Sequence, residues 1–307
     1  MKAYEIKKVL VPIDFSPVSF NALETAVAIC KRQHAILTLI HVIENTYVLF
    51  PPEAGNAVST ILPELIKNAN NNLSNLARKL RTENDLVVHQ IVQSGNPADE
   101  VCRWAHHKKI DLIVAGTHGV SGLREFFMGS NAYRIVKNSP CPTLTVPGIN
   151  QWLDFKKILF PIRLVHNALE KYDIVRPIIR KNGSSLLIAG IVKNNNPTGL
   201  TEMKSIVESV KQKLNEDNVI CGSEVHFCEN VARQVIDLSE IEKPDLIVIT
   251  ATLDTSLKDF FLGPYTQDIV NHAKYPVLSI RPDITKESLG PLHDIQNQFL
   301  NISIETE

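Results

Sequence analysis

The chain contains two copies of one sequence pattern, and this duplication constrains the fold more than any other feature. Four blocks recur in the same order, which is hard to obtain by chance and indicates a tandem repeat of one structural unit. The paired blocks are 7–14 with 156–163, 111–114 with 245–248, 124–129 with 258–263, and 141–147 with 275–282. A chain of 307 residues also has room for about two domains of ordinary size.

The spacing between the copies changes along the chain. Pro12 matches Pro161 in the first pair of blocks, and Gly129 matches Gly263 in the third pair, where the two copies lie closer together in the sequence. The second copy is therefore the shorter one between these points. We expect the deletion after the second strand, where the first copy carries a stretch with Pro and Gly at 45–59.

Each copy alternates apolar runs with helical segments. The apolar runs are rich in Val, Ile and Leu without clean alternation, which is typical of strands buried on both faces of a parallel sheet. In the first copy the expected strands are at about 7–14, 35–44, 86–94, 111–117 and 142–147, and the expected helices at about 17–32, 60–82, 97–109 and 129–138. Asn96 and Pro97 suit the cap and first position of the third helix. This order predicts an α/β fold with two tandem, doubly wound, five-stranded parallel-sheet domains of Rossmann-like type.

The expected organisation is a first domain over 1–150, a second over 151–283 and a polar C-terminal tail over 284–307. A net charge of −1 gives no sign of a nucleic-acid or membrane partner. The five cysteines contain no C-x-x-C pair, which favours structural thiols in a reducing compartment. The N-terminus lacks the apolar core of a signal peptide, and no apolar run approaches the roughly 20 residues of a membrane span. We therefore expect a cytoplasmic protein.

A glycine-rich segment after the fourth strand of the first copy carries the most specific chemistry. It reads Gly116, Thr117, His118, Gly119, Val120, Ser121 and Gly122, and further along come Gly129 and Ser130. Glycines permit positive φ and close backbone approach, so their amides can surround a phosphate. A helix that begins at Gly129–Ser130 adds free N–H groups that favour an anion. The alternative is a glycine-rich crossover that only turns tightly.

The spacing Gly-x2-Gly-x9-Gly-Ser resembles the nucleotide motif of the ATP-binding branch of the universal stress protein family, and it matches at Gly116, Gly119, Gly129 and Ser130. Further family-like features are Val-Pro-Ile-Asp at 11–14, His-Val at 41–42, Gly-Asn-Pro-Ala at 95–98 and Cys-Pro at 141–142. The resemblance covers nearly the whole chain as two copies. It implies a fold like that of the adenine nucleotide alpha hydrolases and ATP as the cofactor, with accompanying Mg left open.

The resemblance also implies roles for individual residues. Asp14 would contact the base or ribose, or act through a metal; its alternative role is the N-cap of the first helix, for which Ser16 competes. Pro12 and Val42 would line the adenine site, Val42 largely through its backbone. The residues expected around the phosphates are Gly116, Thr117, His118, Gly119, Val120, Ser121, Gly122, Gly129, Ser130 and Asn131. For His118, a side chain that simply faces water is the alternative.

The second copy departs from this motif. Thr250 and Leu253 stand at the positions of Gly116 and Gly119, Pro264 at that of Ser130, and Arg163 at that of Asp14. These changes remove glycines and invert a charge at the edge of the expected cleft, so we expect no ATP there. Arg163 could form an ion pair or attract a different anion.

The expected function is that of an ATP-binding regulatory or stress-response module, not an enzyme, with one nucleotide per chain, little or no hydrolysis and an unidentified protein partner. A scaffold or small-molecule-binding tandem module without nucleotide is the alternative. An ATP-using enzyme of the same fold is less well supported, because residues 14–19 lack the Ser-Gly-Gly-x-Asp-Ser and His-x-Gly-His signatures. The resemblance further implies a pseudo-dimer within the chain, in which strands 143–146 and 277–280 pair; a homodimer of whole chains stays open.

Overall fold

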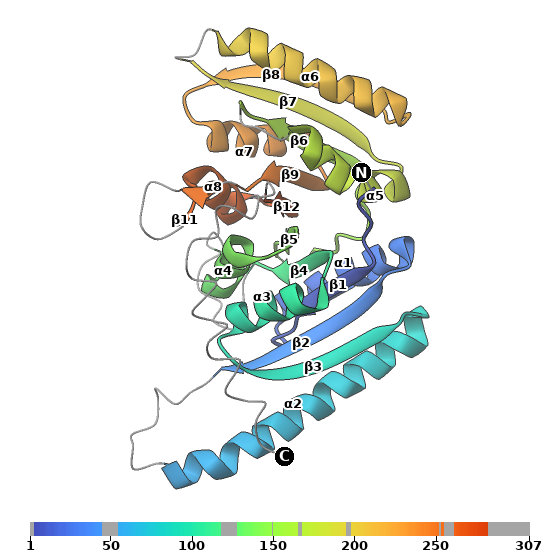
Figure 1. Ribbon diagram of the computed structural model, residues 1–307, viewed down its shortest axis with the longest axis vertical. Coiled ribbons are helices and arrows are strands. Elements are labelled where there is room, and N and C mark those ends of the chain that lie inside the picture. The colour runs from blue at the N-terminus through green and yellow to red at the C-terminus, as the bar shows by residue number, and fades with distance from the viewer. Residues whose placement is uncertain are drawn as a thin grey trace.

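The computed structural model describes residues 3–44, 55–117, 128–148, 150–164, 168–194, 198–251, 253–254 and 261–281 (Figure 1). The first half contains β1 (Lys8–Pro12), α1 (Pro17–Gln33), β2 (Ile36–Glu44), α2 (Gly55–Asn84), β3 (Val88–Gly95), α3 (Pro97–Lys108), β4 (Leu112–Gly116), α4 (Ser130–Asn138) and β5 (Thr143–Val146). The second half contains β6 (Lys157–Ile162), α5 (Ala168–Asn182), β7 (Ser185–Lys193), α6 (Gly199–Glu216), β8 (Cys221–Cys228), α7 (Val231–Glu242), β9 (Leu246–Thr250), β10 (Leu253–Asp254), β11 (Phe261–Leu262), α8 (Pro264–His272) and β12 (Val277–Ile280).

A single ten-stranded sheet runs through both halves in the order β3-β2-β1-β4-β5-β12-β9-β6-β7-β8 (Figure 1). Neighbouring strands are parallel within each half, whereas β5 and β12 are antiparallel, with Leu144 opposite Leu278. The hydroxyl of Thr145 also donates to the carbonyl of Val277 across this junction at 3.2 Å. The α/β fold and the predicted pairing of the two final strands are confirmed, and the two five-stranded sheets are joined into one.

Helices cover both faces of the sheet, as a doubly wound fold requires. Apolar residues of α1, α2, α5 and α6 share one buried cluster on the first face. On the other face, α3 and α4 bury their apolar residues over the first half, and α7 and α8 bury theirs over the second. Successive residues of a strand point to opposite faces: Leu10 belongs to the core under α3 and α4, and its neighbours Val9 and Val11 to the core under α1.

The duplication is visible in the positions of the elements. Strands β6 and β7 follow β1 and β2 at one constant spacing along the chain, whereas β9 follows β4 at a shorter spacing. The residues that the second half lacks therefore lie between its second and fourth strands. There α2 has 30 residues, whereas its counterpart α6 has 18. The predicted deletion after the second strand is confirmed, and it shortens the helix that follows.

Local signals in the sequence place two helix starts that border the functional region. Ser16 caps α1, because its hydroxyl accepts the N–H of Ser19 at 3.1 Å. Asn96 caps α3 by accepting the N–H of Asp99, and Pro97 occupies the first turn as expected. The open question between Asp14 and Ser16 as the cap of α1 is thus decided in favour of Ser16.

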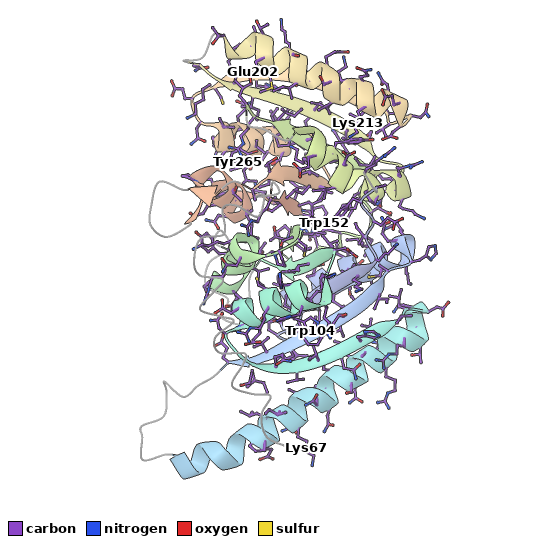
Figure 2. All side chains as sticks on the ribbon, viewed as in Figure 1. Lys67, Trp104, Trp152, Glu202, Lys213 and Tyr265 are labelled. Carbon is purple, nitrogen blue, oxygen red and sulfur yellow. The ribbon has the colours of Figure 1, made fainter. Side chains whose placement is uncertain are left out.

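The segment that joins the halves packs against the second half. The ring of Trp152, which is labelled in Figure 2, meets that of Tyr275 edge-on, with centroids 5.7 Å apart.

Within the described part of the chain, no helix combines the length and apolar character that crossing a membrane requires. The five cysteines are free thiols, and burial raises the pKa of Cys30, Cys102 and Cys141 to about 12. A raised thiol pKa keeps the reactive thiolate scarce at neutral pH.

Candidate functional site

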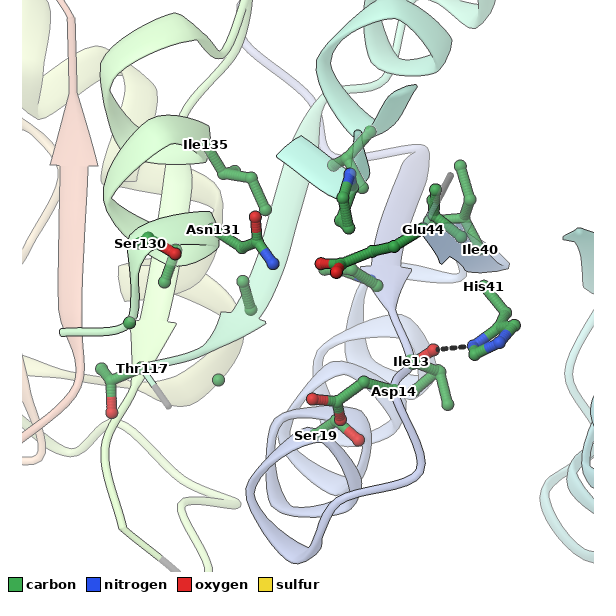
Figure 3. Close-up of a pocket in the computed structure, with 18 residues that line it drawn as sticks. Ile13, Asp14, Ser19, Ile40, His41, Glu44, Thr117, Ser130, Asn131 and Ile135 are labelled. Carbon is green, nitrogen blue, oxygen red and sulfur yellow. Dashed lines mark hydrogen bonds between the residues drawn. The ribbon is translucent and has the colours of Figure 1, made fainter. Parts of the chain in front are cut away.

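A cavity of about 440 Å³ opens at the carboxyl ends of β1, β2 and β4, where doubly wound folds bind ligands (Figure 3). Its size is within the range of small-molecule sites. Its lining comes from β1 and the start of α1 on one side and from α3 and α4 on the other. The lining residues are Pro12, Ile13, Asp14, Ser19, Ile40, His41, Val42, Glu44, Pro97, Val101, Ala115, Gly116, Thr117, Gly129, Ser130, Asn131, Ala132 and Ile135.

The end of β1 is held by a side chain from β2. His41 Nδ1 lies 2.6 Å from the carbonyl oxygen of Ile13, so this nitrogen carries the proton and donates it (Figure 3). The His41 ring also contacts the ring of Phe15, with centroids 5.0 Å apart. Phe15 adopts a φ of 62°, in the left-handed region that a bulky residue rarely enters. These contacts fix the turn that carries Asp14.

Asp14 stands at the rim of the cavity, immediately after β1. One of its carboxylate oxygens accepts the N–H of Ser16 at 3.0 Å, which orients the side chain beside the first turn of α1. Its side chain is exposed and lines the cavity together with Glu44, whose carboxylate points toward Asn131 (Figure 3). The β1–β2 side of the cavity is therefore acidic at its rim.

Gly116 brings β4 close to the start of α1. A Cβ atom at this position would lie 2.8 Å from Cγ1 of Val18 and 3.0 Å from the carbonyl oxygen of Val18. Such distances are shorter than packed atoms tolerate, so the glycine is needed for close approach. The expectation that these glycines supply positive φ is wrong for both described ones: Gly116 is not among the glycines with positive φ, and the φ of Gly129 is −59°.

The opposite end of the cavity is formed by the start of α4. The N–H of Gly129 donates to the carbonyl of Thr117 at 2.7 Å, and this bond joins the two ends of the glycine-rich segment. Gly129 is the N-cap residue of α4, and it has no side chain that could accept the first N–H groups of the helix. The first N–H groups of a helix have no acceptor within the helix, and together with the helix dipole they favour an anion. Ser130 adds a hydroxyl at the same place.

The cavity unites residues from separate parts of the sequence. Of the residues predicted to form the site, those that line it are Pro12, Asp14, Val42, Gly116, Thr117, Gly129, Ser130 and Asn131. The remaining predicted residues, His118, Gly119, Val120, Ser121 and Gly122, lie outside the described residues. Ser19 and Glu44 line the cavity but were not predicted; the signal for Glu44 was its position at the carboxyl end of a strand, the same as for Asp14.

The corresponding region of the second half is built differently. Arg163 and Tyr265 stand at the positions of Asp14 and Asn131, and the guanidinium carbon of Arg163 lies 3.7 Å from the centroid of the Tyr265 ring. Arg163 also donates to the carbonyl of Thr250 at 3.2 Å. The two residues that face each other across the cavity of the first half are thus replaced by a stacked pair. Beyond Thr250, β10 pairs with β11 in a two-stranded ribbon.

The family model of the universal stress proteins matches residues 5–147 and 186–281, which together make up most of the chain. The chain belongs to the universal stress protein family. The first match begins before β1, whereas the second begins within β7 and does not include β6. The sequence resemblance is thereby confirmed at the level of the family and of its tandem arrangement.

Individual universal stress proteins resemble one half of the chain, and a tandem structure resembles both. Universal stress protein MJ0531 of Methanocaldococcus jannaschii is 34% identical over 140 residues, which cover 46% of this chain and 81% of the relative. Universal stress protein YxiE of Bacillus subtilis is 34% identical over 147 residues, covering 45% of this chain and 97% of the relative. A universal stress protein structure from Archaeoglobus fulgidus covers 91% of this chain and 99% of its own, with a TM-score of 0.70 and 15% identity, and supports the two-half fold.

Proposed function

We propose that this protein binds one ATP molecule per chain in the cavity of the first half and acts as a nucleotide-dependent regulatory module. The observation that carries the proposal is the pairing, in one cavity, of an anion-favouring helix start at Gly129–Ser130 with a rim formed by Pro12, Asp14 and Val42. In this proposal the phosphates lie against the first turn of α4, and the adenosine lies toward β1 and β2. The unlike charges of the two ends favour this orientation over the reverse.

A single nucleotide per chain follows from the differences between the halves. In the second half, Arg163 and Tyr265 stack on each other at the positions that correspond to Asp14 and Asn131, two residues that line the cavity of the first half. Pro264 stands at the position of Ser130 in the first turn of α8, and proline has no N–H to offer to a phosphate. In the second half a stacked pair therefore lies at the positions that line the cavity of the first, and one backbone donor is missing.

We propose that the bound ATP is hydrolysed slowly or not at all. Phosphoryl transfer needs an oriented water and charge stabilisation at the γ-phosphate in addition to a cradle. The Nδ1 atom of His41 is already bonded to the carbonyl of Ile13, and the sequence has no Walker-type Gly-Lys-Ser/Thr. ATP would then mark a state of the protein that a partner reads.

A magnesium ion, if it accompanies the nucleotide, would be held by phosphate oxygens together with Glu44, whose carboxylate points toward Asn131 of α4 (Figure 3). Mg²⁺ in proteins is typically bound through one or two carboxylates and substrate phosphates rather than by a protein cage. Among the described residues, no group of three or more His, Cys, Asp and Glu side chains could hold a metal by itself. Its chemical contribution would be to neutralise phosphate charge.

Calorimetry with ATP tests the proposal directly. We expect one site per chain, no heat of binding in the Asp14→Ala and Ser130→Ala double variant, and fewer than one turnover per minute in a phosphate-release assay. The purified protein, denatured by heat, should release adenine nucleotide that mass spectrometry identifies.

Three results would contradict the proposal. Two equivalent sites would mean that the second half binds nucleotide as well. Fast turnover would favour an ATP-using enzyme. Absence of ATP binding in the intact protein would favour a scaffold or a module for another small molecule.

A further inference from the structure

We propose that the second half of the chain holds the phosphate-binding helix α4 of the first half in place, with Asn271 and Arg281 as positioning residues. This inference rests on the proposed function, because it concerns the same nucleotide site. The two residues contact opposite ends of α4 across the junction between the halves, where α4 and α8 face each other (Figure 1). The second half would thus serve the ATP site without having one of its own.

The first contact is at the start of α4. The backbone N–H of Met128 donates to Oδ1 of Asn271, in the last turn of α8, at 3.3 Å. Met128 directly precedes Gly129, and its side chain packs against the buried cluster of the second half. Both the backbone and the side chain of Met128 are therefore attached to the second half. The N–H of Gly129 donates to the carbonyl of Thr117, so the N–H groups left for phosphate begin at Ser130. The attachment of Met128 helps to fix the start of the helix that carries them.

The second contact is at the end of α4. Nη1 of Arg281 donates to the carbonyls of Lys137 and Ser139 at 3.0 and 3.1 Å. The last carbonyls of a helix lack partners within it, and a cation there interacts favourably with the helix dipole. Helix α4 has only 9 residues, a length that is marginal without tertiary contacts. Both of its ends are therefore anchored by side chains from the second half.

Comparison of the two copies shows that the second half anchors α4, whereas the first half cannot anchor α8 in the same way. When the copies are aligned with Gly263 on Gly129, Asn271 corresponds to Lys137 and Arg281 to Pro147. A lysine side chain has no acceptor for a backbone N–H, and a proline side chain has no donor for carbonyls. These two positions of the first half therefore cannot return the contacts to α8. The half in which Arg163 stacks on Tyr265 is thus also the half that supplies both anchors.

Nucleotide binding and the junction should consequently be coupled. If the Asn271 contact favours the conformation of α4 that binds phosphate, bound phosphate must favour the contact equally, since coupling is reciprocal. Nucleotide bound in the cavity of the first half would then stabilise the Asn271 contact on α8 of the second half.

The test measures the affinities of the full chain for ATP and for adenosine by calorimetry. In Asn271→Ala we expect ATP affinity to fall by up to about tenfold, the effect of losing one hydrogen bond, and adenosine affinity to change less than about twofold. Arg281→Ala should give the same pattern. Lys274→Ala is the matched control: Lys274 follows α8, but its ammonium pairs with Glu240 within the second half at 2.8 Å, so neither affinity should change.

The comparison of the two ligands separates positioning from general support of the fold. Equal losses for ATP and adenosine, or no loss for either in Asn271→Ala, would overturn the inference while leaving the proposed function intact. If the unaltered protein binds no ATP, the proposed function fails first and the inference fails with it.

Discussion

Valine in place of Gly116 is expected to lower ATP affinity by about a hundredfold, equivalent to roughly 2.7 kcal/mol. It is also expected to reduce the free energy of unfolding by about 1–3 kcal/mol, the usual cost of overpacking. The added Cβ would lie 3.0 Å from the carbonyl oxygen of Val18, a backbone atom that cannot turn away. The first turn of α1 must then move, and it carries Ser19 at one wall of the cavity and follows Asp14 at the rim.

Calorimetry and urea unfolding measure the two effects separately. Gly116→Ala should lie between the original protein and the valine variant, because it adds the same Cβ without further branches. Gly222→Val is the matched control: it also puts valine into a strand, but the nearest atom to the added Cβ is Cδ1 of Leu187 at 3.7 Å. Unchanged ATP affinity in Gly116→Val would show that the approach of β4 to α1 does not shape the binding site.

The architecture could be predicted from the sequence because the signals that specify it are local or repeated. Each half carries its own strands and helices, the cap at Asn96 is a local signal, and the junction of the final strands followed from the family resemblance. Pro12, Val42 and Asn131 were expected at the site from the family resemblance. Sheet topology explains why Pro12 and Val42 lie together, since a doubly wound sheet brings the carboxyl ends of its strands to one edge, whereas Asn131 lies on α4.

The contacts between the halves were not predictable in the same way. Asn271 and Met128 are 143 residues apart, and although Met128 lies in the repeated block 124–129, nothing in that block indicates its partner. The stacking of Arg163 on Tyr265 was missed because an arginine at the edge of a cleft more often pairs with a carboxylate. The contacts of Asn271 and Arg163 depend on which side chains meet after the elements have packed, and a pattern along one chain does not contain that information. Glu44 is a different case, because its position at the carboxyl end of a strand was a signal in the sequence.

Lys171 is a further residue that the sequence concealed, since it lies in the polar stretch Glu-Lys-Tyr-Asp at 170–173. In the structure it is buried, and its ammonium donates to the carbonyls of Pro161 and Val248 at 2.6 and 3.3 Å and lies 4.0 Å from the centroid of the Phe160 ring. Burial lowers the pKa of Lys171 well below its ordinary value of 10.5, and the nearby charge of Arg163 lowers it further.

The lowered pKa makes the stability of the protein depend on pH in a definite direction. Below the folded-state pKa of Lys171 both the folded and unfolded chains carry the proton, and the folded chain bears the full cost of a buried charge. Between that pKa and 10.5 only the unfolded chain holds the proton. The free energy of unfolding therefore rises with pH in this window, by at most about 1.4 kcal/mol per pH unit.

Methionine in place of Lys171 should remove this dependence and raise the free energy of unfolding at neutral pH by about 1–4 kcal/mol, the range found when buried ion pairs are replaced by apolar side chains of similar volume. Urea unfolding followed by circular dichroism from pH 7 to pH 10 measures both effects. Lys181→Met is the control, because Lys181 lies near the end of the same helix and is exposed. If Lys171→Met and the original protein gave parallel stability curves over this range, the ammonium would have to titrate normally in the folded state. The two carbonyl bonds would then stabilise the charge as well as water does.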